Sequence, residues 1–303
     1  MNADSSTAPP RGEYSAAAMY GILFVQQLLA ASTHFVAKFA NQGSDPFTIV
    51  FVRGVITVLA FAVILLPQRK ALASIRREDW KWIALLGLLN IPCNQILFVA
   101  GLRFTIPPNA ALAYALVPAF MLVLSALFFK ERTPAQKVVG IGVAFFGTLL
   151  ILFERGIDLS SAFFWGNAME LSAAVSWSMY SLLGQRLSRR YGAIYTTGLS
   201  MASGIAWYSL AFPFLPFRQP LSELSGETIF YAAYLALAAS VLGYWLWYFA
   251  LARLPSSNVA VFSNLQPVLV TIISIVVFAT FPSGQFLLGG ALVLLGVLLT
   301  QRK

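Results

Sequence analysis

Polar side chains stand inside long apolar stretches of this 303-residue chain, and these are the groups that could act chemically. The stretch LNIPCNQILF contains Asn90, Asn94 and Gln95. Asn90 and Asn94 are four residues apart and share a helix face, and Pro92 opens the helix between them. Amides both donate and accept hydrogen bonds, which suits a zwitterionic or other polar metabolite. The alternative is hydrogen bonding from helix to helix.

Aromatic and amide side chains extend this candidate binding set. Trp177, Tyr180 and Tyr244 lie deep in apolar stretches of the second half. Aromatic walls of this kind could hold an apolar side chain and attract an ammonium group through cation–π contact. Packing against lipid is an equal alternative for each of them. Three further binding candidates stand close to two prolines: Tyr114, Asn264 and Gln266.

Four charged or titratable residues stand inside apolar stretches: His34, Lys38, Arg53 and Glu170. Lys38 is near the end of its stretch and can extend to the lipid headgroups. Arg53 lies about 10 Å along its helix, so we expect partial snorkelling or a structural ion pair. His34 titrates near neutral pH, and a carboxyl group such as Glu170 can exchange a proton where burial penalises its charged form. Both are candidates for proton coupling, and for Glu170 the alternative is a donor on a neighbouring helix.

Catalytic and metal chemistry find little support in the sequence. His34 is the only histidine, and no acid, base or metal-ligand set groups with it by spacing. Cys93 is the only cysteine, so no intrachain disulfide can form. We therefore predict a protein that is not an enzyme and that needs no cofactor.

The elements that position these groups follow from composition. The chain is 59% hydrophobic and 10% charged, with a mean hydropathy of +0.77, and apolar stretches of about 18 or more residues can cross a bilayer as helices. Turn signals predict an all-α integral membrane protein after a disordered cytoplasmic tail at residues 1–16. The ten expected spans are 17–40, 47–66, 81–102, 108–129, 136–153, 162–186, 193–215, 228–252, 258–280 and 285–301.

The basic residues are distributed unevenly between the two sides of these spans. Of the 20 Lys and Arg residues, Arg53 lies deep within a span and only four lie on the side opposite the N-terminus, namely Lys38, Arg103, Arg155 and Arg218. Cytoplasmic loops carry the Lys/Arg excess. We therefore expect both termini to lie in the cytoplasm, and the protein to reside in the inner (cytoplasmic) membrane. Topology explains the net charge of +9 without nucleic-acid binding.

Two halves of the chain resemble each other. At a shift of 149 positions, residues 101–151 lie over 250–300, with Pro118 on Pro267 and Asn109 on Asn258. This predicts two five-helix repeats, 17–153 and 154–303. Because five is odd, the second repeat is inverted relative to the first, an arrangement typical of secondary transporters. Pro92, Pro118 and Pro267 are then candidate hinges of an alternating-access cycle, although prolines are common in membrane helices in any case.

Two segments are similar to a known family. Residues 131–153, ERTPAQKVVGIGVAFFGTLLILF, resemble the end of the first EamA repeat of the drug/metabolite transporter (DMT) superfamily. Residues 240–267, SVLGYWLWYFALARLPSSNVAVFSNLQP, resemble its eighth-to-ninth helix segment. The resemblance implies ten helices, a central cavity and movement of small organic solutes, with the YddG branch of bacterial aromatic amino-acid exporters the nearest. One departure is that Glu131 falls on Thr280 in the second repeat, so a symmetric role for this glutamate is not expected.

These observations together predict an exporter of small metabolites, with aromatic and neutral amino acids as the leading substrates and a monomer or homodimer as the assembly. One alternative is a proton-coupled exporter of cationic drugs. A carrier of phosphorylated sugars or nucleotide sugars is less favoured, because few cations stand at membrane depth.

Overall fold

The computed structural model describes residues 14–68, 75–129, 134–152, 161–215, 219–279 and 281–301, and within these ranges the chain is helical with no strand. The predicted tail up to residue 13, Glu131 and Thr280 lie outside them. The first half contains α1 (Ala16–Gly43), α2 (Pro46–Leu65), α4 (Trp80–Leu88), η3 (Leu89–Gln95), α5 (Ile96–Phe104), α6 (Pro107–Ala115), α7 (Val117–Phe129) and α8 (Ala135–Leu152).

The second half repeats this pattern of long and interrupted helices. It contains α9 (Ala162–Tyr191), α10 (Ala193–Ala211), α11 (Gly226–Tyr234), η6 (Leu235–Gly243), α12 (Tyr244–Arg253), α13 (Ser256–Ala260), η7 (Val261–Asn264), α14 (Leu265–Phe278) and α15 (Gly284–Gln301). Short 3₁₀ turns complete the described elements: η1 (Leu66–Gln68), η2 (Arg77–Asp79), η4 (Phe212–Phe214) and η5 (Leu221–Glu223).

Six helical stretches in the described residues are long and apolar enough to cross a membrane: Ala17–Gly43, Pro46–Leu65, Arg77–Phe104, Pro107–Phe128, Gly226–Arg253 and Ser256–Phe278. Two shorter apolar helices cover Val138–Ile151 and Gly284–Leu299. The remaining expected spans, 162–186 and 193–215, fall on α9 and α10, which are helical but less apolar.

Helix starts follow from local sequence. Ser15, Asp45 and Ser225 each accept a hydrogen bond from the backbone amide three residues later, which satisfies an otherwise free first-turn donor. Pro46 occupies the first position of α2, where a missing amide hydrogen costs nothing. Between α9 and α10, Gly192 has a φ of +88°, a conformation that glycine adopts readily.

Helix interruptions occur at matching places in the two halves. The third expected span contains the π-helical segment η3, with Pro92 inside it, and the eighth contains the π-helical segment η6. The fourth span breaks at Leu116, two residues before Pro118, and the ninth passes through the 3₁₀ turn η7 before Pro267. π-helical turns are rare and frequently mark functional sites.

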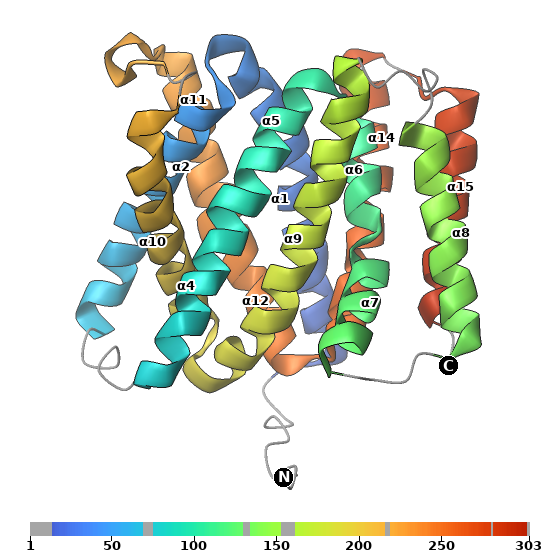
Figure 1. The fold of residues 1–303 in the computed structure, drawn as a ribbon, viewed down its shortest axis with the longest axis horizontal. Coiled ribbons are helices and arrows are strands. Elements are labelled where there is room, and N and C mark those ends of the chain that lie inside the picture. The colour runs from blue at the N-terminus through green and yellow to red at the C-terminus, as the bar shows by residue number, and fades with distance from the viewer. Residues whose placement is uncertain are drawn as a thin grey trace, which may run out of the picture.

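The helices lie side by side in a bundle, with α8 and α15 paired along one side (Figure 1). Helix α9 packs against α5, η3, α7 and α12, and α1 packs against α5, η6, α12 and α14. The contact between α5 and α9 is close: a Cβ placed on Gly101 would lie 3.0 Å from the carbonyl oxygen of Gly166. Helices from both halves therefore surround the centre of the bundle.

Candidate functional site

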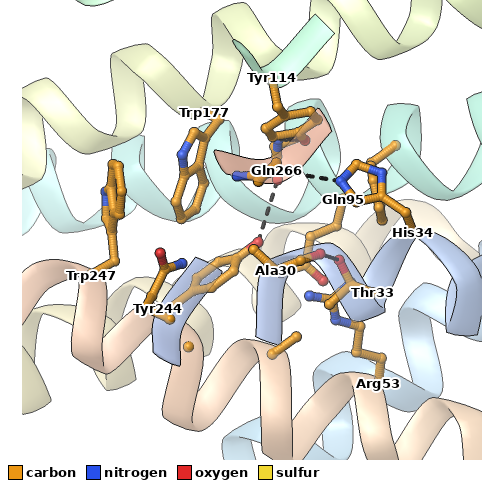
Figure 2. A pocket seen from close by; sticks show the side chains of 15 residues that line it. Ala30, Thr33, His34, Arg53, Gln95, Tyr114, Trp177, Tyr244, Trp247 and Gln266 are labelled. Atoms are coloured by element: carbon orange, nitrogen blue, oxygen red, sulfur yellow. Dashed lines mark hydrogen bonds between the residues drawn. The ribbon is translucent and has the colours of Figure 1, made fainter. Parts of the chain in front are cut away.

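A cavity of about 560 Å³, including its open mouth, lies among these central helices (Figure 2). Both halves of the chain line it, and the two π-helical segments both contribute. The lining residues are Gln26, Ala30, Thr33, His34, Arg53, Asn94, Gln95, Phe98, Tyr114, Trp177, Ala239, Gly243, Tyr244, Trp247 and Gln266. Concave sites that combine apolar and aromatic walls with a few placed polar groups are typical of small-molecule binding.

Asn94 joins four segments at one wall of the cavity. Its Nδ2 donates to the Tyr114 hydroxyl at 2.7 Å and to the Ala173 carbonyl oxygen at 2.8 Å. Its Oδ1 accepts from the Tyr244 hydroxyl at 3.4 Å. Because the side chain is 2% exposed, these bonds hold the amide in one orientation, and it links η3 to α6, α9 and α12.

His34 and Gln266 connect the first helix to the second half. The His34 Nε2 and the Gln266 Oε1 lie 3.2 Å apart, drawn as a dashed line in Figure 2. The imidazole meets the rings of Phe98 and Tyr114 edge-on, with centroids 5.1 and 5.9 Å away. The Nδ1 atom of His34 is buried without a hydrogen-bond partner in the described part of the chain.

Aromatic rings form the opposite wall. The ring centroid of Trp177 lies 4.7 Å from that of Tyr244 and 5.6 Å from that of Trp247. The Trp247 Nε1 donates to Ser181 Oγ at 2.9 Å, so its polar edge is satisfied within the protein. Figure 2 shows Trp247 and Trp177 on one side, with His34, Thr33 and Arg53 on the other. The two tryptophans therefore lie at one end of the cavity, and His34, Thr33 and Arg53 give the other end its polar character beside Phe98 and Tyr114.

Arg53 occupies the polar end. Its side chain is 2% exposed, and its Nε donates to Ser240 Oγ at 2.9 Å. Within the described ranges no acidic residue forms a salt bridge with it. The expectation that Arg53 snorkels or forms an ion pair is thus wrong for the described structure. The guanidinium instead lines the cavity, because α2 turns this residue toward η6.

Comparison with known proteins agrees with this architecture. The sequence model of the EamA-like transporter family matches residues 18–153 and again residues 164–302. The chain belongs to the EamA-like transporter family. The family resemblance expected from residues 131–153 and 240–267 is confirmed at this level.

Relatives of this EamA-like protein carry transporter names. "Uncharacterized transporter YyaM" of Bacillus subtilis (strain 168) is 26% identical over 92% of both chains. A "Probable terminal-alkyne amino-acid exporter" of Streptantibioticus cattleyicolor is 28% identical over 82% of both chains. A "Probable amino-acid metabolite efflux pump" of Salmonella typhimurium is 27% identical over 79% of this chain and 82% of that one. A solved crystal structure shares the fold, with a TM-score of 0.66 and 23% identity over 95% of this chain and 97% of the other.

Six of the expected binding residues of this EamA-like protein line one cavity together with His34: Asn94, Gln95, Tyr114, Trp177, Tyr244 and Gln266. Asn90, Tyr180 and Asn264 are not among the lining residues. The Asn90 Nδ2 donates to the Met201 sulfur at 3.2 Å, and the Tyr180 hydroxyl lies 2.9 Å from Ser200 Oγ. Both of these side chains face α10 rather than the cavity.

Glu170 and Lys38 lie outside the cavity lining. Glu170 on α9 is fully buried against Gly101 of α5, and neither carboxyl oxygen has a hydrogen-bond partner in the described residues. Lys38, which we expect to be able to reach the headgroups, is partly buried and bonds to the protein. Its Nζ donates to the carbonyl oxygens of Leu102 and Thr105, at 2.7 and 2.8 Å, and so satisfies the C-terminal end of α5.

The sequence reasoning missed several lining residues, chiefly Gln26, Thr33, Phe98 and Trp247. A signal for some of them was present. Gln26, Ala30, Thr33 and His34 follow the spacing of one helix face, so two polar residues share that face with the only histidine. Trp247 has no comparable signal, because its neighbours Trp245 and Tyr248 are equally aromatic.

Proposed function

We propose that this protein is a secondary transporter that exports small organic metabolites across the cytoplasmic membrane by alternating access. The leading substrates are amino acids with aromatic or neutral side chains. The observation that carries the proposal is the central cavity, which has two tryptophans at one end and polar side chains at the other and is lined by both halves of the chain.

The proposed transport unit has ten membrane helices in two inverted five-helix repeats, with both termini in the cytoplasm. Three observations support it. The family model matches two successive ranges of the chain. The π-helical segments η3 and η6 interrupt the third and eighth spans. The breaks next to Pro118 and Pro267 interrupt the fourth and ninth. Irregular backbone at membrane depth is tolerated where it lines a cavity, and paired interruptions give each half an equivalent place to bend.

The proposed substrate class follows from the groups that line the cavity. Asn94, Gln95 and Gln266 provide amide donors and acceptors, and Trp177 and Trp247 provide apolar faces. An amino acid with an aromatic or aliphatic side chain presents groups that complement both ends. Two relatives at 27–28% identity bear names of amino-acid or amino-acid-metabolite exporters, which favours the same class.

The alternatives receive less support from the cavity. A cationic drug would meet the Arg53 guanidinium, and no described lining residue carries a carboxylate to offset it. A phosphorylated sugar carries two negative charges, whereas Arg53 is the only Lys or Arg among the lining residues. Proton coupling through Glu170 remains a separate proposal that does not depend on the cavity.

Counterflow in liposomes tests the proposal. Purified protein is reconstituted into vesicles loaded with unlabelled phenylalanine, and radiolabelled phenylalanine is supplied outside. We expect the label to accumulate above protein-free vesicles, and unlabelled leucine or methionine to suppress that accumulation. If folded protein gives no accumulation with any amino acid, the amino-acid class is wrong and cationic drugs become the next substrates to examine.

A further inference from the structure

We propose that Arg53 binds the carboxylate of the transported compound, and that this carboxylate, rather than an ammonium group, decides which compounds occupy the cavity. The inference rests on the proposed transport function and specifies its substrate class. It assigns this role to a residue for which the sequence suggested only snorkelling or a structural ion pair.

The burial of Arg53 is the first support. A guanidinium that is 2% exposed has lost most of its water, and a buried charge is costly unless it is paired and hydrogen-bonded. One donor, Nε, is used by Ser240, and the guanidinium also interacts with the neutral hydroxyls of Tyr244 and Tyr114. None of these partners neutralises the charge. In the described residues the cation therefore stands at the cavity without a counter-ion, and a bound anion would supply one.

The geometry of the guanidinium favours a carboxylate. Its planar fork of N–H donors matches the two oxygens of a carboxylate, and such paired hydrogen bonds are stronger than those between neutral groups. The bond from Nε to Ser240 on η6 fixes one edge of the fork. Besides Ser240, the hydrogen-bond partner described for the guanidinium is the neutral Tyr244 hydroxyl, so a charged ligand can compete for its remaining donors. A dianionic phosphate would need a second cation; Lys38 lies outside the cavity lining and is already bonded to carbonyl oxygens at the end of α5.

An ammonium group has a weaker place to bind. Two amide oxygens at the cavity already accept a bond or face a donor: Asn94 Oδ1 accepts from Tyr244, and Gln266 Oε1 faces His34. Gln95 Oε1 has no partner in the described residues, but this atom is buried. The aromatic faces of Trp177 and Tyr244 remain, and cation–π contact with them is offset by repulsion from Arg53. It follows that an aryl carboxylate without an amine should bind, whereas the amine without a carboxylate should bind much more weakly.

The same geometry orients the ligand. Arg53 and Trp247 lie at opposite ends of the cavity (Figure 2). A carboxylate at Arg53 therefore directs the apolar part of the ligand toward Trp177 and Trp247. Because Ser240 belongs to η6 in the second half while Arg53 belongs to α2 in the first, a ligand held by Arg53 also contacts the junction between the halves.

A set of four phenyl compounds tests the inference on the native protein. Phenylalanine has both charged groups, 3-phenylpropionate has only the carboxylate, phenylethylamine has only the ammonium, and phenylalaninamide has the ammonium with a neutral amide. Binding is measured by calorimetry in detergent, independently of transport. We expect 3-phenylpropionate to bind within about 10-fold of phenylalanine. We expect the amine and the amide to bind at least about 100-fold more weakly, since each lacks the charged partner of a buried cation.

Substitution of Arg53 provides a second readout. Arg53→Gln removes the charge but keeps a polar side chain of moderate length. We expect it to abolish the preference for 3-phenylpropionate over phenylethylamine, and Arg53→Lys to retain part of that preference. Arg103→Gln, at an exposed arginine outside the cavity, is the matched control and should leave the preference unchanged. A purely structural role for Arg53 would lower the affinity for all four compounds equally.

The outcomes separate this inference from the transport proposal. If phenylethylamine and phenylalaninamide bind as tightly as phenylalanine and 3-phenylpropionate, Arg53 does not select its ligand by the carboxylate, even if phenylalanine counterflow succeeds. Binding of the acids without counterflow would support the anchor and count against amino-acid export. If none of the four compounds binds to folded protein, both proposals fail. If Arg53→Gln does not fold, the comparison of ligands on the native protein still decides the inference.

Discussion

Asn90 and Asn94 are two buried asparagines, four residues apart. Their different contacts allow a role in ligand binding to be distinguished from a role in helix packing. Asn94 faces the cavity and holds Tyr114 and Tyr244. Asn90 does not line the cavity: its Nδ2 donates to the Met201 sulfur, and its Oδ1 accepts from Nε2 of Gln95. We expect Asn94→Ala to weaken phenylalanine binding by about 10-fold or more, because the Tyr114 hydroxyl and the Ala173 carbonyl lose a donor, at about 1–3 kcal/mol. Calorimetric affinity and Tm are the measurements.

Asn90→Ala is the matched control for that variant. It removes the same side chain from the same segment, so we expect a similar fall in Tm but an affinity close to that of the native protein. Equal loss of affinity in both variants would mean that the asparagines act through the shape of η3, and would count against a direct role for Asn94 in the cavity.

Glu170 presents a different question, because its carboxyl group is fully buried and has no hydrogen-bond partner in the described residues. Glu170→Gln keeps the shape and removes the ionisable group. Since Glu170 lies outside the cavity lining, we expect phenylalanine affinity to change by less than about threefold, well under 1.4 kcal/mol. Transport is then measured with and without a pH gradient. If the pH gradient changes the transport rate of the native protein but not that of Glu170→Gln, Glu170 couples transport to protons. If the gradient changes both rates equally, Glu170 has no role in proton coupling.

At the scale of elements, the pairing of α8 with α15 depends on glycine. A Cβ on Gly147 would lie 2.5 Å from the Gly289 carbonyl oxygen and 2.8 Å from the Leu292 Cβ. We therefore expect Gly147→Leu to separate the two helices and to cost about 1–3 kcal/mol of stability, as overpacking typically does. Thermal unfolding in detergent measures this as a lower Tm. Because this pair stands at the side of the bundle (Figure 1), ligand affinity should be retained.

Gly142 supplies the control on the same helix. A Cβ there would meet nothing within 4 Å, and the residue is exposed. Gly142→Leu should therefore leave Tm near its native value. A fall in Tm equal to that of Gly147→Leu would show that helix α8 itself, rather than its contact with α15, is sensitive to the substitution.

The helix positions were predictable from the sequence because apolar length and turn residues act locally. The expected spans 47–66 and 108–129 differ by a single residue at most from the observed α2 and α6–α7 ranges. The prolines predicted where backbone would be irregular, and Pro92 lies inside η3. The π-helical segment η6 was not predictable in this way, since it contains no proline; it packs against α1 and α2, contacts that the local sequence does not indicate.

Site residues were predictable only in part, because the direction of a side chain depends on how helices pack. Asn94 and Asn90 have the same residue type and a shared helix face in an ideal helix, yet only Asn94 lines the cavity. The π-helical turn of η3 changes the angle between them, which a regular helical wheel does not include. Arg53 was expected to snorkel or pair from its depth along α2, but the structure turns it toward η6, a contact between distant parts of the chain.

At the scale of the whole molecule, the proposed orientation in the membrane rests on the uneven distribution of Lys and Arg between the two sides of the expected spans. The segments η2 and η5 lie at opposite ends of the bundle, at the starts of α4 and α11 (Figure 1). Each segment has an exposed glutamate: Glu78 in η2 and Glu223 in η5. The positive-inside rule assigns the end with Glu78 to the cytoplasm and the end with Glu223 to the outer side.

Cysteine labelling in intact cells measures this orientation directly. In a Cys93→Ser background, which removes the only native thiol, Glu78→Cys and Glu223→Cys place one exposed thiol at each end by the same kind of substitution. A membrane-impermeant maleimide should label Glu223→Cys in intact cells and Glu78→Cys only after permeabilisation. The reverse pattern would invert the topology, and labelling of both without permeabilisation would place both ends outside the cell. Either result would contradict cytoplasmic termini. An even number of membrane crossings separates the N-terminus from Glu78 and from the C-terminus, so these three lie on one side. An odd number of crossings separates the N-terminus from Glu223, which therefore lies on the other side.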